Sequence, residues 1–158
     1  MSISDMIVVM KDGIVQQIGQ PQVVYDDPVN LFFAKFLGTP PINVFEGEVK
    51  SDKLYIGEDC ILNIKNVPDR KVYVGIRPEG FILNDNGALS CALSGLEVMG
   101  RDISVVSSNK NCLSTTIRSI ISAENKVDLA SSAVKFDVKP NKVFIFSHET
   151  EERIRFDV

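Results

Sequence analysis

The sequence places one charged pair at a sharply defined corner, Arg77 and Glu79, on either side of Pro78. They follow an apolar run, residues 72–76, which predicts a buried strand that Pro78 ends. Side chains two positions apart at a strand end point the same way. The pair could tie the corner through an ion pair or hydrogen bonds, or could contact another domain or a regulatory protein. No nucleophile or metal-ligand set accompanies it, so we predict no catalytic, cofactor-binding or metal-binding residue.

Other polar residues carry weaker signals. Adjacent carboxylates such as Asp26 and Asp27 can do acid–base chemistry, but beside a proline a loop or helix cap is expected. Arg101 lies between two expected strands, either in a plain turn or in a loop that faces a ligand or partner. The three cysteines form no C-x-x-C pair, so we predict reduced thiols and no zinc site. His148 is expected at the surface.

The first forty residues predict a hairpin followed by two short helices. Residues 6–10 and 14–18 are apolar, and Asp12-Gly13 between them is a strong hairpin turn signal. A helix over residues 21–25 is broken by Pro28, and a second helix ends near Gly38. Its apolar positions recur at helical spacing, which predicts either a packed face or a protein-interaction surface. These positions are Val29, Phe32, Phe33, Phe36 and Leu37.

Beyond Pro41 the apolar period changes to about two, which is typical of strands. Many short strands joined by Asn, Gly, Ser and Pro turns predict an all-β, barrel-like domain. We place the boundary between appendage and main domain at residue 40, giving units 1–40 and 41–158. The expected strands are 43–49, 53–56, 61–64, 72–76, 81–83, 92–99, 103–107, 113–117, 134–138 and 142–146.

The composition of the chain excludes some classes of binding partner. The chain has 158 residues and a net charge of −4. A negative chain lacks the basic face that nucleic acid requires, so we predict no nucleic-acid partner. Its apolar runs are all shorter than the roughly 20 residues that span a bilayer, so any membrane link is expected to go through a partner.

Two tracts together resemble the ATP-binding subunit of a carbohydrate-type ABC importer, of the maltose and glycerol-phosphate kind. The first is DMIVVMKDGIVQQIGQPQVVYDDPVNLFFAKFLGTPPIN, residues 5–43, and the second is VYVGIRPEG, residues 72–80. They are similar to the end of the family's ATPase domain and to the "G-[IV]-R-P-E" of the β-rich domain that follows it. Met6, Gln20 and Gly80 depart from the family pattern without weakening the resemblance.

The nucleotide-binding motifs of that family are absent from the sequence. It has no G-x-x-x-x-G-K-[ST] loop to cradle phosphate, no L-S-G-G-Q-like segment and no strand ending in Asp-Glu. The opening MSISD looks like the residues just after the family's switch histidine. We therefore expect a fragment that begins after the nucleotide chemistry, is not an enzyme and needs no cofactor, whereas the parent subunit would use ATP and Mg²⁺.

The resemblance implies an oligonucleotide-binding (OB) type fold, the transport-associated (TOBE) domain, acting as a regulatory and dimerisation module. It implies a homodimer, membrane-spanning permease partners, a possible regulatory protein, and a location on the cytoplasmic face of the membrane. Candidate interface residues are Arg77, Glu79, Arg101, Phe32, Phe33 and Phe36. An alternative is a small barrel that binds oxyanions through backbone N–H groups. Single-stranded nucleic-acid binding is disfavoured by the charge.

Overall fold

The computed structural model describes residues 7–11, 14–19, 25–36, 40–125, 127 and 130–158. Thirteen strands and one α-helix account for most of them, in the order β1 (Ile7–Lys11), β2 (Ile14–Gly19), α2 (Leu31–Phe36), β3 (Asn43–Lys50), β4 (Lys53–Ile56), β5 (Asp59–Asn63), β6 (Arg70–Ile76), β7 (Phe81–Leu83), β8 (Leu89–Met99), β9 (Asp102–Ser108), β10 (Ile117–Ser122), β11 (Ala133–Val138), β12 (Val143–Ser147) and β13 (Arg153–Ile154). Single 3₁₀ turns, η1 (Pro78–Gly80) and η2 (Pro140–Lys142), precede β7 and β12.

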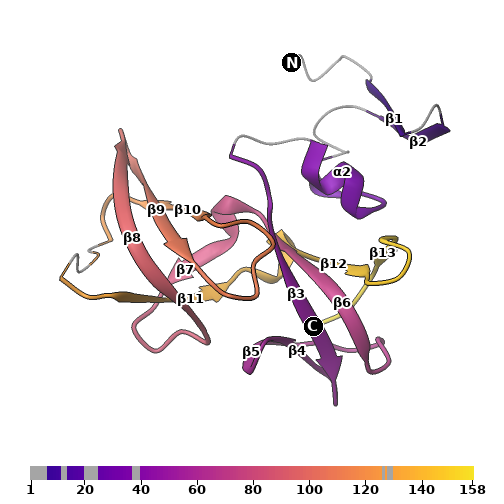
Figure 1. Ribbon diagram of the computed structural model, residues 1–158. Coiled ribbons are helices and arrows are strands. Elements are labelled where there is room, and N and C mark those ends of the chain that lie inside the picture. The colour runs from indigo at the N-terminus through magenta and orange to yellow at the C-terminus, as the bar shows by residue number, and fades with distance from the viewer. Residues whose placement is uncertain (1–6, 12–13, 20–24, 37–39, 126, 128–129) are drawn as a thin grey trace.

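The strands form three antiparallel sheets. One has six strands in the order β13-β12-β6-β3-β4-β5, one has five in the order β10-β9-β8-β11-β7, and β1 pairs with β2 alone. In Figure 1 the five-stranded sheet lies to the left and the six-stranded sheet to the right, with α2 and the hairpin above the latter. The all-β prediction is confirmed. Neither larger sheet closes into a ring among the described pairings, and the OB-type barrel stays a prediction.

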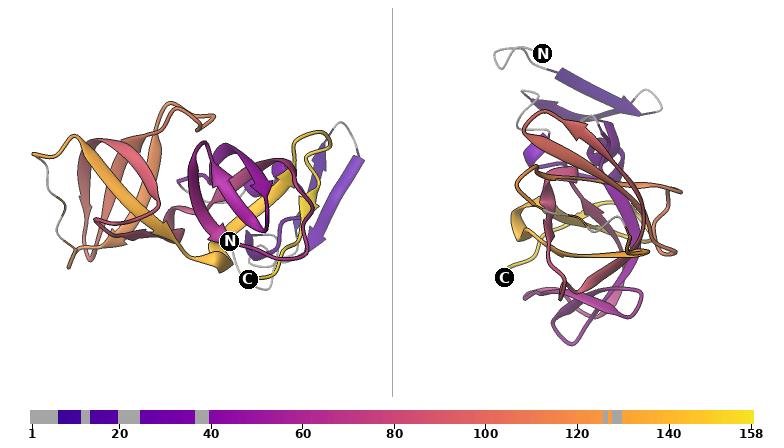
Figure 2. Two further views of the ribbon diagram at one scale, coloured as in Figure 1. Left: turned by 90° about the horizontal axis from the view of Figure 1, so that it is seen from below. Right: turned by 90° about the vertical axis from the view of Figure 1, so that its left-hand side faces the viewer.

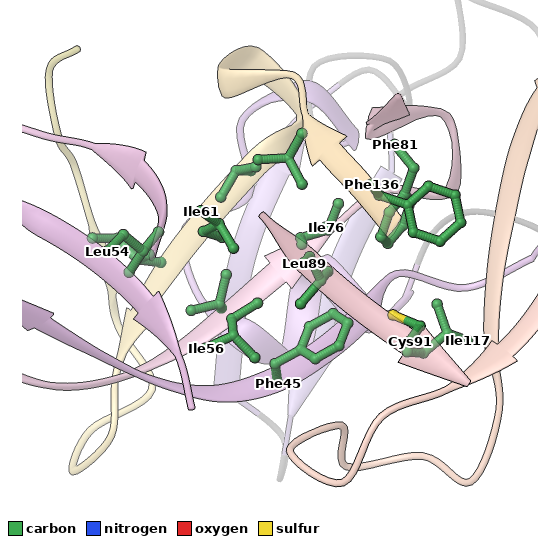
Figure 3. Packing of buried hydrophobic residues seen from close by; sticks show 14 of the residues in the cluster. Phe45, Leu54, Ile56, Ile61, Ile76, Phe81, Leu89, Cys91, Ile117 and Phe136 are labelled. Atoms are coloured by element: carbon green, nitrogen blue, oxygen red, sulfur yellow. The ribbon is translucent and has the colours of Figure 1, made fainter. Parts of the chain in front are cut away.

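The two larger sheets share one hydrophobic core. Figure 3 shows side chains from both sheets converging, including Phe45 and Ile56 from the six-stranded sheet and Leu89 and Phe136 from the five-stranded one. The rings of Phe81 and Phe136 meet edge to face, with centroids 5.1 Å apart. The left view of Figure 2 shows the two sheets side by side. This common core makes residues 43–158 depend on both sheets for stability.

Period-two alternation on β3 and β12 produces a second, smaller apolar cluster on the opposite face of the six-stranded sheet. On β12, Val143 and Ile145 belong to the main core, whereas Phe144 and Phe146 belong to the second cluster. The second cluster consists of Leu31, Ala34, Ile42, Val44, Phe144 and Phe146. Helix α2 therefore covers one face of this sheet and the shared core covers the other.

Most predicted strands are confirmed, and two of them, 53–56 and 81–83, have the predicted bounds. The predicted strand at 113–117 is wrong, because the strand there is β10, Ile117–Ser122. Residues before it run along β3 instead, with Leu113 N donating to Val44 O at 2.8 Å. Strand β13 was not predicted at all.

The N-terminal predictions are confirmed in part. Strands β1 and β2 pair antiparallel, but their turn at residues 12–13 lies outside the described residues, as do most of the first predicted helix and the boundary region at 37–39. The division at residue 40 stays a prediction. No helix in the described part of the chain has the length and apolar character needed to cross a membrane.

Candidate functional site

The Arg-Pro-Glu corner lies where the central strand β6 meets the turn η1. Pro78 takes the first position of η1, where a missing N–H costs nothing, and Gly80 N donates to Arg77 O at 2.8 Å to close the turn. Arg77 N donates to Lys142 O at 3.1 Å, so the corner is also fixed to the start of β12. The backbone of Arg77 is thereby held between two turns.

The Arg77 side chain is buried, at 1% exposed, and reaches the N-terminal segment. Its Nη1 donates to Ala34 O at 2.9 Å and its Nη2 to Tyr25 O at 2.7 Å. The guanidinium also lies over the Tyr25 ring, 3.9 Å from the centroid. Burial lowers the pKa of Arg77, while the nearby Tyr25, Glu79 and Asp26 oppose that shift. An arginine keeps its charge in proteins, so this is a buried cation held by main-chain carbonyls.

Glu79 contacts the same tyrosine from the other side. Its carboxylate accepts the Tyr25 hydroxyl at 2.9 and 2.7 Å, and Lys142 Nζ lies 4.0 Å from it. Burial, followed by the bond to Glu79 and its charge, raises the pKa of Tyr25 well above its usual range, so the hydroxyl remains a donor. Among the described ion pairs, the partner of Glu79 is Lys142 and not Arg77. Tyr25 bridges the two residues that the sequence pattern paired directly.

A second set of charges, missed by the sequence reasoning, binds the same segment. Arg153 donates to Asp27 Oδ1 at 3.0 Å and to Pro28 O at 2.9 Å, and Arg155 lies 2.9 Å from Asp27. The side chain of Arg153 is 14% exposed. The spacing of the two arginines, two apart at a strand end, was a usable signal for a shared face. Nothing in the sequence pointed to Asp27 as their partner.

Main-chain hydrogen bonds also join residues 29–31 to residues 151–153. Leu31 N donates to Glu151 O, and Arg153 N donates to Val29 O, both at 2.9 Å. Asn30 and Glu152 form an isolated antiparallel bridge. The acidic turn between β12 and β13 therefore forms main-chain contacts with residues 29–31.

The remaining candidates lie elsewhere or are only partly described. Arg101 is exposed in the turn between β8 and β9, in the sheet that lies away from α2 in Figure 1. Phe32 is half-buried, while the side chains of Phe33 and Phe36 lie outside the described residues. Among the described side chains of α2, Leu31 and Ala34 are buried, neither of which was in the predicted stripe, and Val29 before the helix is 39% exposed. The interface role of the phenylalanines stays a prediction.

A cavity of about 300 Å³ adjoins the corner, lined by Tyr25, Asp26, Arg77, Asn141, Lys142 and Phe144. Two cations, Arg77 and Lys142, lie among these residues together with the carboxylate of Asp26, and Lys142 Nζ lies 4.0 Å from Glu79. The lining residues include no serine, threonine, cysteine or histidine. The geometry therefore holds one segment of the chain against another, through balanced charges and main-chain carbonyls.

Known proteins similar to this chain match it over nearly its whole length. It is 36% identical to the ABC transporter ATP-binding protein MG187 homolog of Mycoplasma pneumoniae, over 98% of the chain and 26% of that protein. It is 32% identical to the oligosaccharides import ATP-binding protein MsmX of Bacillus subtilis, over 94% of the chain and 44% of MsmX. It is 28% identical to the sn-glycerol-3-phosphate import ATP-binding protein UgpC of Shigella boydii, over 98% of the chain and 44% of UgpC.

No protein-family model matches the chain. The chain spans between about a quarter and less than half the length of these relatives. All three relatives are ATP-binding proteins by name, and their matches cover both the N-terminal segment and the β domain. The chain is therefore homologous, over nearly its whole length, to ABC transporter ATP-binding proteins.

Proposed function

We propose that this chain is the regulatory and dimerisation part of the ATP-binding subunit of an ABC importer for sugars or related solutes. The observation that carries the proposal is the use of the Arg-Pro-Glu corner. Arg77, the buried cation, and Glu79 both form hydrogen bonds with residues 25–34 of the chain itself. A corner of that kind supports an interface and not a reaction.

The relatives support the same class of role. Two of them are named for import of oligosaccharides and of sn-glycerol 3-phosphate. In this proposal residues 1–40 end the ATPase domain and residues 41–158 form the OB-type transport-associated domain. The fragment carries out no nucleotide chemistry, because its sequence lacks the phosphate-binding loop. ATP and Mg²⁺ would belong to the complete subunit.

The proposed partners follow from that role. A second copy would pair through the β domain, permease subunits would link the assembly to the cytoplasmic face of the membrane, and a regulatory protein could dock on the exposed strands. A two-fold homodimer requires a self-complementary patch. Nucleic acid is not among the partners, given the net charge of −4.

The alternative function, oxyanion binding, has less support. A cavity of about 450 Å³ between the two sheets includes Glu58 and Asp59 against a single cation, Lys110. Carboxylates at that density repel an anion. A calorimetric titration with sulfate, molybdate and phosphate would restore this alternative if one of them bound at micromolar concentration.

The decisive test is a chimera of MsmX in which the matched C-terminal portion is replaced by this chain, expressed in Bacillus subtilis that lacks MsmX. Uptake of oligosaccharide should return, and should depend on the ATPase portion of MsmX. A control chimera carrying only residues 1–40 of this chain should fail. If the full chimera is folded and abundant, and hydrolyses ATP but never supports uptake, the proposed role is wrong. Light scattering of the chain alone, at high micromolar concentration, tests the dimer separately.

A further inference from the structure

The six-stranded sheet has two apolar faces that are covered in different ways. One face contributes Phe45, Val143 and Ile145 to the core shared with the five-stranded sheet. The other face presents Val44, Phe144 and Phe146. None of the described side chains of residues 25–36 belongs to the shared core.

Helix α2 contributes apolar side chains to the second face. Among those that the structure describes, Leu31, at 2% exposed, and Ala34, at 0%, are buried there.

Two arginines that contact the Phe144 ring also hold this segment. The guanidinium of Arg77 lies 5.7 Å from the ring centroid and that of Arg153 lies 4.6 Å from it. Arg77 donates to the carbonyls of Tyr25 and Ala34, and Arg153 to that of Pro28. These bonds fix the path of the main chain, and the side chains of Tyr25 and Asp27 add bonds to Glu79 and Arg153.

We propose that residues 25–36 are a cap that opens from the six-stranded sheet as a unit while both larger sheets stay folded, and that Arg153 and Arg77 are the residues that hold the cap closed. Opening breaks a limited set of polar contacts and leaves the shared core intact, which is the condition for local rather than global unfolding. It uncovers Val44, Phe144 and Phe146 as a new apolar face. This inference does not rest on the transporter assignment.

Amide hydrogen exchange of the intact 158-residue chain tests the proposal. The amide of Leu31, bonded to Glu151 O, reports on the cap, and the amides of the central strand β6 report on the sheets. Arg153→Ala should speed exchange in residues 29–36 by roughly tenfold to a hundredfold, from the loss of charged hydrogen bonds. Exchange in β6 should not change. Arg118→Ala, which removes an arginine paired with Glu97 on the other sheet, should leave both regions as they are.

Arg153→Lys and Arg77→Lys give a second measure. Lysine keeps the charge but lacks the planar fork, so each variant should speed cap exchange by a smaller factor than alanine does. The proposal is wrong if cap exchange stays at the parent rate in Arg153→Ala. It is equally wrong if amide exchange in β6 becomes faster by the same factor as exchange in the cap. The same holds if Arg153→Ala and Arg153→Lys both unfold the whole chain, because the cap and the sheets would then be one cooperative unit.

Discussion

The carboxamide of Asn43 pairs with the peptide group of Arg118 as a neighbouring strand would. Asn43 Nδ2 donates to Arg118 O at 3.0 Å, and Arg118 N donates to Asn43 Oδ1 at 3.1 Å. The same Nδ2 donates to Ile76 O at 3.2 Å. One buried side chain on β3 thus ties the six-stranded sheet to β10, the edge strand of the other sheet.

Replacing Asn43 should destabilise the chain. Asn43→Ala leaves the peptide group of Arg118 without these bonds and should cost about 1–3 kcal/mol in the free energy of unfolding. Asn43→Asp should cost more at neutral pH, because a carboxylate cannot donate to two carbonyls, and less as acid protonates it. Urea unfolding at two pH values measures both. Asn125→Ala, an exposed residue bonded to Ser122 O, is the control and should change little. Equal effects at positions 43 and 125 would contradict the pairing.

Gly75 should tolerate alanine better than Gly87 does. At Gly75 the nearest atoms to an added Cβ are side-chain atoms, Ile42 Cδ1 at 2.8 Å and Phe146 Cε2 at 3.4 Å. A terminal methyl can shift. At Gly87 the Cβ would lie 2.5 to 2.7 Å from backbone atoms of Phe136, which cannot. We expect Gly87→Ala to cost about 1–3 kcal/mol or more, and Gly75→Ala less. Melting temperatures in the reverse order would refute this.

Asp27 should contribute a small acid dependence to stability. The hydrogen bond from Arg155 lowers the pKa of Asp27, with the charges of both arginines in support and burial opposing. A carboxyl whose folded pKa is lowered stabilises the fold above its unfolded pKa, near 3.9, and loses that contribution as the pH falls through the folded value. Because Asp27 is half exposed, the effect should be about 0.2–1 kcal/mol.

Comparing Asp27→Asn with the parent from pH 7 to pH 2 measures that contribution. The difference between them should shrink toward the acid end. Asp85→Asn, at an exposed position that follows β7, is the control. A constant difference across the whole range would mean that the carboxylate charge of Asp27 plays no part.

Cys91 should be inert toward thiol reagents in the folded chain. Burial raises its pKa to about 11, so the reactive thiolate is scarce at neutral pH. The half-buried Cys60 should react first with a maleimide, and Cys91 only after denaturation. Mass spectrometry of the labelled peptides gives the order. Labelling of Cys91 as fast as Cys60 under native conditions would show that the core opens more readily than its packing implies.

Sequence patterns were most informative where period-two alternation is regular, as for Val134, Phe136 and Val138 of β11. They failed at β10 because Ser119, a polar residue at 0% exposure, occupies an inward position and breaks the apolar alternation. The corner was recognisable from its three residues. Its partners were not, because Tyr25 and Ala34 approach Arg77 only through the path of a distant segment. The burial of Arg77 follows from that same approach.

The central claim is that the Arg-Pro-Glu corner works by holding residues 25–36, and a double-mutant cycle between Tyr25 and Glu79 tests it most directly. Tyr25→Phe, Glu79→Ala and the double variant are compared by chemical unfolding, with the exposed pair Arg118 and Glu97 as the control cycle. We predict a coupling of about 1 kcal/mol or more for Tyr25 and Glu79, and about 0.5 kcal/mol or less for the control. Additive effects of Tyr25→Phe and Glu79→Ala would contradict the claim.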